Sequence, residues 1–425
     1  MQELWLDWFA GCFGRVEVRR TAWFYVQGLL SLVGRKNCWW LAQHAGHRDP
    51  GRMQRLLCAT RWDADVLRDA LLRCVAGLLG ASDGLLIVDE TGFAKKGNAS
   101  VGTARQYSGT LGKVDNCQVA VFLAYATNRA RLLVDRVLYL PRAWTDDPTR
   151  CADAGVPAGT EFATKAQLAL VMIRRALAAG LRAGWLAADE AYGRDSRFRT
   201  ALRGLRLPYV VAVARDQHVR SGGQRYRVDV LTALLPADAW QTYPCGLGSK
   251  GPRLYRWAWV AIDGPAGDHS LLVRRGADNT LAYYLTWHPV GVSLPTLVSV
   301  AGRRWCIEEG FQISKDAFGL DQYQTRSWHG WHRHTTLAMV TLAITVLAAH
   351  HDQTPPATEH DIAACTLIPV TVNEVQRLIA ALILHTRDIG RALVDHILTW
   401  SNWRRQHQAT ARAAHYQRRL AIQNR

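Results

Sequence analysis

The feature of this 425-residue chain that most restricts its fold is a change of hydrophobic period between residues 83 and 214. Apolar residues first recur with the spacing of β-strands, and strand-like runs then alternate with helix-like runs. In chain order the elements are three strands, a helix, a strand, a helix and a last strand. These segments are residues 83–92, 116–127, 131–141, 163–181, 184–190, 195–205 and 207–214.

This order of elements is the one that a ribonuclease-H-like fold requires. The first three strands suggest an antiparallel meander, because only residues 128–130 separate the second from the third. The helix at 163–181 then brings the chain back, so that the fourth strand lies parallel and adjacent to the first. The predicted fold class is therefore α/β, with a ribonuclease-H-like mixed sheet.

Other segments add helical ends and a β-rich insertion to this core. Short strands and turns without helical period interrupt it, and the prolines at 355 and 356 mark a linker before a tail that ends basic. The predicted units are a helical N-terminal DNA-binding domain (1–80), two parts of the catalytic core (81–214 and 291–352), the β-rich insertion (215–290) and a basic helical C-terminal region (353–425).

The charge of the chain favours a polyanionic partner. Lysine and arginine number 52 against 35 aspartates and glutamates, which gives a formal net charge of +17. A basic surface gains free energy on binding nucleic acid because condensed counterions are released. A GC-rich genome also enriches arginine regardless of function, so the charge alone does not decide between these explanations.

Cysteine usage and hydropathy indicate the compartment. The nine cysteines are odd in number, scattered and never arranged as a CxxC pair, which favours a reducing cytosol and disfavours a zinc site. The N-terminus does not resemble a signal peptide, and the longest apolar stretch, residues 335–349, is too short to span a bilayer. We therefore expect a soluble, cytoplasmic protein without a membrane partner.

Two aspartates follow the first and fourth strands of the predicted core. Asp89 lies in LLIVDETGF and Asp189 in WLAADEAYG, so burial of the strands brings both acids to one edge of the sheet. Two-metal phosphoryl transfer needs carboxylates from separate elements, and hard divalent cations prefer such oxygen ligands. A lone aspartate at a strand end is usually a cap or turn residue, whereas two on neighbouring strands favour catalysis.

A third acid lies between two cations in a helix-period run. Arg304, Glu308 and Lys315 are four and seven residues apart, which places them on one face of a single helix. In a catalytic interpretation, Arg304 and Lys315 contact the phosphates on either side of the scissile bond. The structural alternative is an exposed helix on which Arg304 and Glu308 form an ordinary ion pair. We rank Glu309, which follows directly, as a neighbour.

Five segments together resemble the bacterial insertion-sequence DDE transposases with a tyrosine-arginine-glutamate-lysine signature. The segments are residues 88–97, 104–125, 135–147, 187–195 and 303–328. The resemblance implies a ribonuclease-H-like core interrupted by a β-strand insertion, and cut-and-paste movement of a DNA segment with inverted ends. It also implies Mg²⁺ as the cofactor, with Mn²⁺ as a substitute, and a homodimer on double-stranded DNA.

The resemblance also assigns roles to individual residues. The catalytic and metal-binding acids and the two signature cations fall on Asp89, Asp189, Glu308, Arg304 and Lys315. One position departs from the pattern, because the signature tyrosine falls on Ala301. The phosphate contact of that tyrosine is therefore absent or supplied by another residue.

Further DNA contacts are expected from a glycine-rich stretch and a tryptophan. The stretch at 92–113 combines glycines with the cations Lys95, Lys96, Arg105 and Lys113, although it is alternatively a solvated hairpin loop. It does not match a P-loop, so no nucleotide cofactor is implied. Trp287, in the insertion, would suit stacking on a base flipped from a cut DNA end, although most tryptophans are core residues.

The sequence thus predicts a DNA transposase that binds the ends of an insertion sequence, cuts the DNA and joins it to a target. Two alternatives stay open: a transposase-derived DNA-binding regulator without catalysis, and a hydrolytic DNA nuclease on the same fold. The three acids count against the regulator. The nuclease needs the same metal site, so the sequence does not separate it from a transposase.

Overall fold

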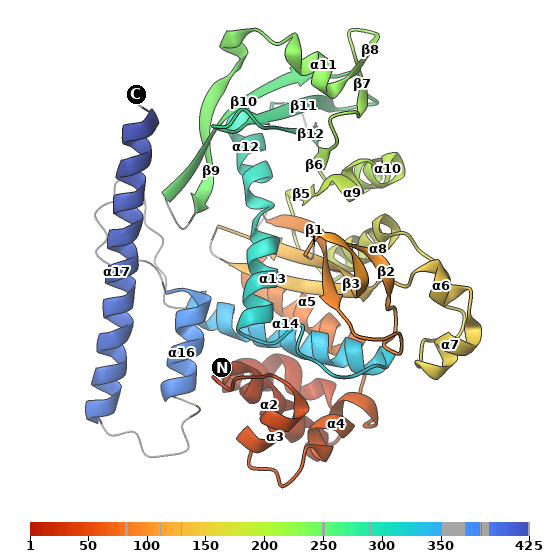
Figure 1. Cartoon of the computed structure of the whole chain (residues 1–425), viewed down its shortest axis with the longest axis vertical. Coiled ribbons are helices and arrows are strands. Elements are labelled where there is room, and N and C mark those ends of the chain that lie inside the picture. The colour runs from red at the N-terminus through yellow and green to blue at the C-terminus, as the bar shows by residue number, and fades with distance from the viewer. Residues whose placement is uncertain are drawn as a thin grey trace.

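The chain forms a large mixed sheet with helices at both ends (Figure 1). In Figure 1 the N-terminal helices α2, α3 and α4 lie at the bottom, the long helix α14 (Trp328–His350) lies between them and the sheet, and the insertion forms the top. The predicted α/β fold class is confirmed. The computed structural model describes residues 1–80, 84–110, 112–128, 130–248, 251–288, 291–350, 370–382, 384 and 391–423.

The core strands pair as the sequence predicts. They are β1 (Leu85–Ala94), β3 (Lys113–Ala126), β4 (Arg131–Leu138), β5 (Trp185–Ala188) and β6 (Tyr209–Val213). β1, β3 and β4 form an antiparallel meander, and β1 pairs in parallel with β5, which pairs in parallel with β6. The order β4-β3-β1-β5-β6 is that of a ribonuclease-H-like core. A short strand β2 (Ala104–Ser108), which the sequence did not predict, pairs with β3.

β1 ends later than expected. The sequence predicted an apolar run that ends in the acid pair and a glycine, at residue 92, but the strand continues to Ala94 because β3 still pairs with it there. Its parallel partner β5 stops earlier, at the pair Val88–Ala188. Asp89 therefore lies in the middle of β1, at the position where its parallel neighbour ends.

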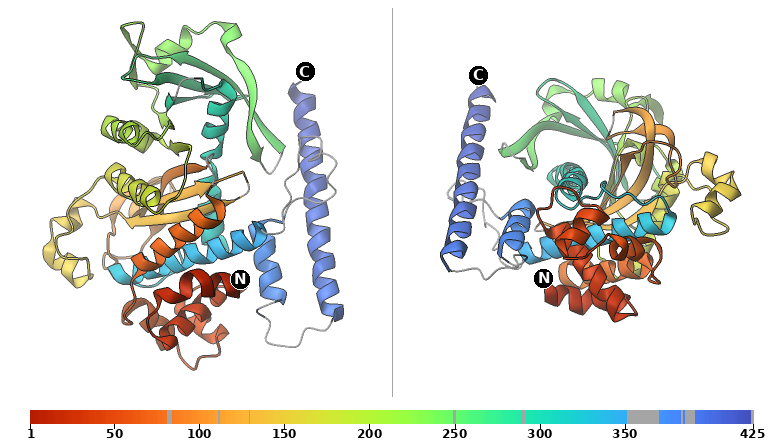
Figure 2. Two further views of the ribbon diagram at one scale, coloured as in Figure 1. Left: turned by 180° about the vertical axis from the view of Figure 1, so that it is seen from behind. Right: turned by 60° about the horizontal axis from the view of Figure 1, so that its bottom comes forward.

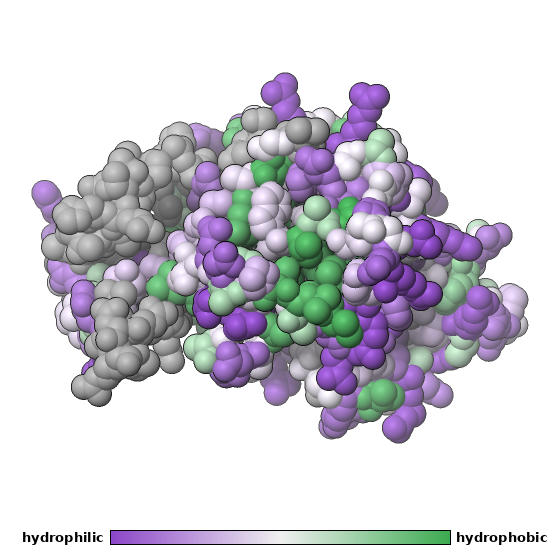
Figure 3. Space-filling model, turned by 90° about the horizontal axis from the view of Figure 1, so that it is seen from above, coloured by the Kyte–Doolittle hydropathy of each residue, from purple (hydrophilic) through white to green (hydrophobic). Residues whose placement is uncertain are grey.

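The insertion extends the core sheet and does not form a separate one. Its strands are β9 (Gln241–Gly248), β10 (Gly251–Ala261), β11 (Asp268–Arg275) and β12 (Leu281–His288). β12 pairs antiparallel with β6, and β11, β10 and β9 follow outward. A two-stranded hairpin, β7 (His218–Ser221) and β8 (Gln224–Arg227), lies off this sheet. From above, hydrophobic residues gather in the middle of this end and hydrophilic ones surround them (Figure 3).

The helices of the N-terminal region pack around apolar side chains. They are α1 (Gln2–Leu4), a π-helical turn (Trp5–Phe9), a 3-10 turn (Ala10–Cys12), α2 (Val16–Leu30), α3 (Cys38–His44), α4 (Gly51–Cys58) and α5 (Ala64–Leu79). Asn37 and Asp63 cap α3 and α5 by accepting hydrogen bonds from backbone N–H groups of the first turn. Trp5 and Phe9 are buried in the core of this region.

Shorter helices connect the strands. They are α6 (Arg142–Thr145), α7 (Pro148–Asp153), α8 (Lys165–Ala178), α9 (Glu190–Gly193), α10 (Ser196–Gly204) and α11 (Val228–Ala233), with a 3-10 turn at Ala237–Ala239. α8 is the crossover that makes β1 and β5 parallel. A capping box between Thr164 and Gln167 fixes the start of α8, because each side chain satisfies the backbone N–H of the other residue.

The chain returns to helix after the insertion. The single helix predicted at 297–319 is two helices, α12 (Leu294–Arg303) and α13 (Cys306–Asp316), with a break at Arg304 and Trp305. The last described helices are α16 (Val372–Leu382) and α17 (Arg391–Gln423), and α17 stands beside the rest of the chain in both views of Figure 2. The linker predicted at the prolines 355 and 356 lies outside the described residues. No described helix is long and apolar enough to cross a membrane.

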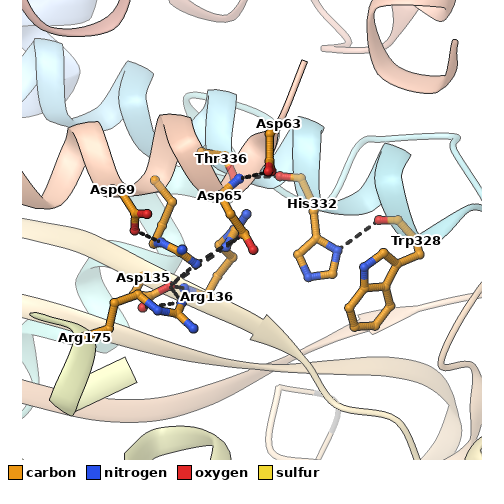
Figure 4. A network of polar contacts seen from close by, with 10 residues as sticks. Asp63, Asp65, Asp69, Asp135, Arg136, Arg175, Trp328, His332 and Thr336 are labelled. Carbon is orange, nitrogen blue, oxygen red and sulfur yellow. Dashed lines mark hydrogen bonds and ion pairs between the residues drawn. The ribbon is translucent and has the colours of Figure 1, made fainter. Parts of the chain in front are cut away.

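A buried ion cluster joins the N-terminal helices to the sheet (Figure 4). Asp135 of β4 is fully buried, and it accepts hydrogen bonds from Arg175 of α8 at 3.0 and 3.2 Å, with Arg68 of α5 at 3.7 Å. The buried Arg136 donates to Asp65 of α5 at 2.9 Å. Burial raises the pKa of Asp135, although the three arginines oppose that shift. The cluster thus ties α5, β4 and α8 together.

We expect Asp135→Asn to lower the free energy of unfolding by about 3 kcal/mol, because buried guanidinium groups lose their counter-charge. Asp69→Asn is the matched control. Asp69 accepts from Arg68 at 2.7 Å in the same cluster, but its side chain is 42% exposed. We expect this control to lose less than about 1 kcal/mol. Urea denaturation measures both values, and equal losses would show that burial of Asp135 does not matter.

A second buried group makes stability depend on pH. His334 of α14 lies 2.8 Å from the hydroxyl of Tyr25 and 3.0 Å from the carbonyl oxygen of Gly319. Burial lowers the pKa of His334 to about 4. The unfolded chain binds this proton near pH 6.5 (about the model-peptide value), so the folded state is destabilised as the pH falls through this window.

We therefore expect the stability advantage of the wild type over His334→Gln to narrow by about 2 kcal/mol between pH 7 and pH 5. The control is His329→Gln, because His329 is an exposed histidine of the same helix. Urea denaturation of the three proteins at both pH values measures the difference. If the difference in unfolding free energy between the wild type and His334→Gln were the same at pH 7 and pH 5, burial of His334 would not be a source of the pH dependence.

Candidate active site

The pairing of β1 with β5 brings two aspartates to neighbouring positions. Asp89 follows Val88 on β1 and is 9% exposed, and Asp189 directly follows Ala188, the last residue of β5. The carboxylate of Asp189 caps α9 by accepting a hydrogen bond from the N–H of Ala191 at 3.0 Å. The two acids thus lie side by side at the end of the parallel pair, as the sequence predicted.

A glycine holds the turn after Asp189 against the sheet. The N–H of Gly193 donates to the carbonyl oxygen of Asp189 at 2.9 Å. A Cβ atom on Gly193 would lie 1.8 Å from the carbonyl oxygen of Ala212 on β6. Any side chain at this position would therefore push α9 away from β6 and displace Asp189 with it.

Burial and mutual repulsion disfavour the ionised forms of both acids. Burial, followed by the charge of Asp189, raises the pKa of Asp89 to about 8, although Arg304 lowers it. Burial, followed by the charge of Glu90, raises the pKa of Asp189 to about 6. Oxygen donors of this kind suit a hard divalent cation, whose charge would relieve the repulsion between them.

Arg304 connects the acid pair to the third acid. Its guanidinium donates to Asp89 Oδ2 at 3.1 Å and to Glu308 Oε1 at 2.7 Å. The pair with Glu308 is the one that the structural alternative predicted, and it forms although the helix is broken at Arg304. The pair with Asp89 is not explained by an ordinary exposed helix. It joins the start of α13 to β1, against which α13 packs (Figure 1).

Glu308 does not lie with the two aspartates as a ready ligand set. One of its oxygens is held by Arg304, and the described part of the chain contains no assembled group of three or more side chains that could hold a metal ion. Asp89 and Asp189 fit a divalent cation by the chemistry and burial of their oxygens. Glu308 could join them only if Arg304 gave up its position.

Lys315 reaches the same face of β1 as Asp89. Its ammonium group donates to Thr91 Oγ1 at 2.8 Å and lies 5.5 Å from the centre of the Phe93 ring. Side chains two residues apart on a strand share a face, so Thr91 and Phe93 continue the face on which Asp89 lies. The structure thus brings Arg304 and Lys315 to either end of one short stretch of β1.

Glu90 lies on the opposite face and has its own partners. Lys165, at the start of α8, lies 2.6 Å from Glu90 Oε1, and the hydroxyl of Tyr192 donates to Oε2 at 2.7 Å. Glu90, which directly follows Asp89, was not among the predicted site residues, and the sequence singled out neither of its partners. Their positions are the only signal that could have identified them in the sequence. Lys165 is the first residue of the crossover helix, and Tyr192 lies in the turn after Asp189.

The other expected DNA contacts are spread over the surface. Lys95 is half-buried over the ring of Tyr323, with 3.7 Å between its ammonium nitrogen and the ring centre, and burial lowers the pKa of Lys95 to about 8. Lys96 and Arg105 are exposed. Lys113 is exposed as well, but it pairs with Asp115 at 3.1 Å. None of these cations is among the groups that surround Asp89.

Trp287 lies away from the acids. It pairs with Tyr209 between β12 and β6, and Tyr209 pairs with Leu186, three residues before Asp189. Its indole N–H donates to the carbonyl oxygen of Ala266 at 3.0 Å. The structure therefore does not bring Trp287 to the acids.

The residue at the position of the missing signature tyrosine is part of the packed interior. Ala301 is buried within α12. A different tyrosine, Tyr284 of β12, is close enough to sense the charge of Arg304. Burial raises the pKa of Tyr284, and Arg274 and Arg304 partly oppose this shift. Tyr284 could not be identified from the sequence, because only the pairing of the insertion with the core brings it near α12.

Known families match most of the chain. Residues 8–232 match the DDE superfamily endonuclease family, and residues 163–346 match the transposase DDE domain. The probable transposase for insertion sequence element IS701 of Microchaete diplosiphon is 28% identical over 326 residues, which cover 75% of this chain and 80% of that protein. The solved NurA nuclease of Sulfolobus solfataricus is 8% identical, with a TM-score of 0.27 and coverage of 65% of this chain and 88% of that chain. That likeness is too slight to bear on function.

The chain therefore belongs to the DDE superfamily endonuclease family. It is a DDE transposase, as the sequence predicted, and DNA is its substrate. Enzymes of these families generally depend on divalent metal ions. These matches do not test the tyrosine-arginine-glutamate-lysine signature, which stays a prediction.

Proposed function

We propose that Asp89, Asp189 and Glu308 are the residues with which this transposase cuts the ends of an insertion sequence and joins them to target DNA. The observation that carries the proposal is the buried pair of Asp89 and Asp189, because strongly perturbed carboxylates with too little positive charge around them are typical of catalytic sites. Mg²⁺, or Mn²⁺ in its place, would supply activation of the attacking oxygen and stabilisation of the leaving one.

Arg304 has two successive tasks in this proposal. Before DNA binds, the guanidinium of Arg304 pairs with Asp89 and Glu308 and so reduces the repulsion between the carboxylates of the site. When Glu308 turns to join the two aspartates, the guanidinium is free to donate to a DNA phosphate. Its planar fork suits two oxygens of one phosphate, just as it now serves two carboxylates.

The remaining side chains position the strand and the DNA. Lys315, tied to Thr91 on the same face, would hold a phosphate beyond the one held by Arg304. Glu90, with Lys165 and Tyr192, links β1 to α8 and to the turn after Asp189. This link fixes the relative position of the two aspartates, and small displacements of such groups slow catalysis strongly.

DNA would also contact the N-terminal domain, residues 1–80. Trp39 and Trp40 of α3 are 61% and 47% exposed and border a groove of about 420 Å³ that Arg48 also lines. Exposed aromatic rings beside cations suit stacking on DNA bases and contact with phosphates. The exposed Lys96 and Arg105 would add backbone contacts, and Trp287 would contact DNA only at a distance from the acids.

The transposase would act as a homodimer, because two ends of one DNA segment must be held together. The support within the chain is α17, which contacts α16 and β10 and leaves Trp403 52% exposed. A long helix with an exposed aromatic residue suits contact with a second copy.

We expect Asp89→Asn, Asp189→Asn and Glu308→Gln each to reduce strand cleavage at least 100-fold (on the order of the loss for removing one group that stabilises the transition state) and to leave DNA binding largely intact. The measurement is mapping of strand breaks and joined products on duplex DNA that carries the ends of the element, with Mg²⁺. Glu309→Gln is the control, because Glu309 pairs with Arg131 at the surface, 2.5 Å apart. Wild-type cleavage by any acid variant would remove that residue from the site, and breaks without joined products would favour a hydrolytic nuclease.

The role of Arg304 can be separated from that of a simple ion pair. We expect Arg304→Ala to bind Mn²⁺ about tenfold more tightly without DNA, because a competing cation is gone, and to cleave about 100-fold more slowly. Arg304→Lys keeps the charge but not the fork, so its cleavage should also be impaired. Calorimetric titration with Mn²⁺ and cleavage rates measure both effects. Full cleavage by Arg304→Lys with only a lowered melting temperature would leave Arg304 as a structural ion-pair partner.

A further inference from the structure

An arginine-rich pocket lies between α10 and the β7–β8 hairpin. Its volume is about 320 Å³. Arg199 and Arg203 line it from α10, Arg220 and Arg225 line it from the hairpin, and His269 of β11 closes it. None of these residues belongs to the group around Asp89, and the proposed catalysis uses none of them.

The four arginines form two like-charged pairs. Arg199 and Arg203 are four residues apart on α10, and therefore one turn apart on the same face. Arg220 lies directly opposite Arg225 in the register of the hairpin. Like charges destabilise both arrangements, a helix pair four residues apart and a directly opposed strand pair. The fold nevertheless directs both pairs to one cavity.

One carboxylate in the described lining, that of Asp263, offsets this charge only in part, because four arginines share the pocket with it. Its two oxygens accept the N–H groups of Gly222 and Gly223 at 3.2 and 2.8 Å. Arg203 donates to the hydroxyl of Tyr209 at 3.1 Å, and Arg199 donates to the carbonyl oxygen of Gly193, both of them neutral acceptors. These acceptors orient the two arginines but carry no counter-charge, so the arginines of the described lining outnumber its single carboxylate.

The charge of the pocket acts on the histidine in its wall. Burial lowers the pKa of His269, and Arg203 and Arg199 lower it further, although a hydrogen bond with the carbonyl oxygen of Pro265 opposes them. The interior of the pocket is therefore electropositive and suits an anion. Guanidinium groups bind phosphate oxygens in pairs, which makes a phosphate group the best-matched anion for four arginines.

We propose that this pocket binds a backbone phosphate of the DNA that the active site engages, an inference that rests on the proposed function. The geometry favours DNA over a free anion. Arg199 holds Gly193, which ends the turn that begins at Asp189. Tyr209 in the pocket wall pairs with Leu186, three residues before Asp189 and so about 10 Å away along the strand. Along the axis of a duplex this distance is the rise of about three base pairs, at about 3.4 Å each.

The test is the double variant Arg220→Ala/Arg225→Ala of the full chain. The matched control is Arg227→Ala, because Arg227 lies on the same strand but pairs with Asp229 at 2.6 Å. Fluorescence anisotropy measures binding of a fluorescein-labelled duplex that carries the element end, over a range of NaCl concentrations. We expect the double variant to bind about tenfold more weakly, with a log-affinity against log-salt slope shallower by about 1 to 2. The control should bind as the wild type does.

Folding of the double variant is checked by its melting temperature, which should equal or exceed that of the wild type because a like-charged pair is gone. If the alanine variant lost cooperative melting, Arg220→Gln/Arg225→Gln would carry the same test. Unchanged affinity and slope would overturn the proposal. A second result would also overturn it: inorganic phosphate raises the melting temperature of the wild type but not of the double variant, while both bind DNA equally well. The pocket would then bind the free anion.

Failure of this inference differs from failure of the proposed function. If the wild type made no strand breaks but the double variant lost DNA affinity, the pocket would stand and the catalytic assignment would fall. If the wild type cut and joined DNA but the double variant bound it normally, the catalytic assignment would stand and the pocket would not be a DNA contact.

Discussion

The parallel pairing of β1 with β5 is the constraint on which the rest of this protein depends. Four consecutive apolar residues of β1, Leu85 to Val88, are fully buried between β3 and β5, so the strand cannot shift without loss of the core. Asp89 follows these residues and is buried with them. Burial disfavours the charged form of the Asp89 carboxylate. Two features lie around this carboxylate: the turn that holds Asp189, and the break between α12 and α13 at Arg304.

The core strands, their order and the placement of Asp89 beside Asp189 were predictable because each leaves a periodic or spaced signal in the chain. The end of β1 was not, since its partner β3 determines where it ends. Nor was the contact of Arg304 with Asp89, which are 215 residues apart. Trp287 likewise shows that a local sequence pattern does not predict distances between residues of different strands. The sequence placed it in a strand, but its separation from the acids follows from the register of three strands.

Buried acids are neutralised in two different ways in this fold. Three arginines surround the single buried carboxylate of Asp135, and the surrounding acids balance them, so no ligand is needed. In the proposed active site Arg304 alone pairs with Asp89 and Glu308, and no ion pair within the described residues includes Asp189. The first arrangement holds elements in place. The second lacks positive charge, and a divalent cation matches what is missing.

The arginine pocket is the opposite case, because four arginines line it with only the single carboxylate of Asp263 among the described residues. On the proposals made above, a DNA strand that fills the pocket also brings phosphates to the acids, where their negative charge would add to the repulsion between Asp89 and Asp189. DNA would therefore bind at the acids more tightly when divalent cations bind there too. The cations in turn would bind more tightly when phosphate oxygens are among their ligands. Such coupling is reciprocal. The repulsion between the acids would thus make the binding of DNA and of metal ions cooperative, so that cleavage requires both.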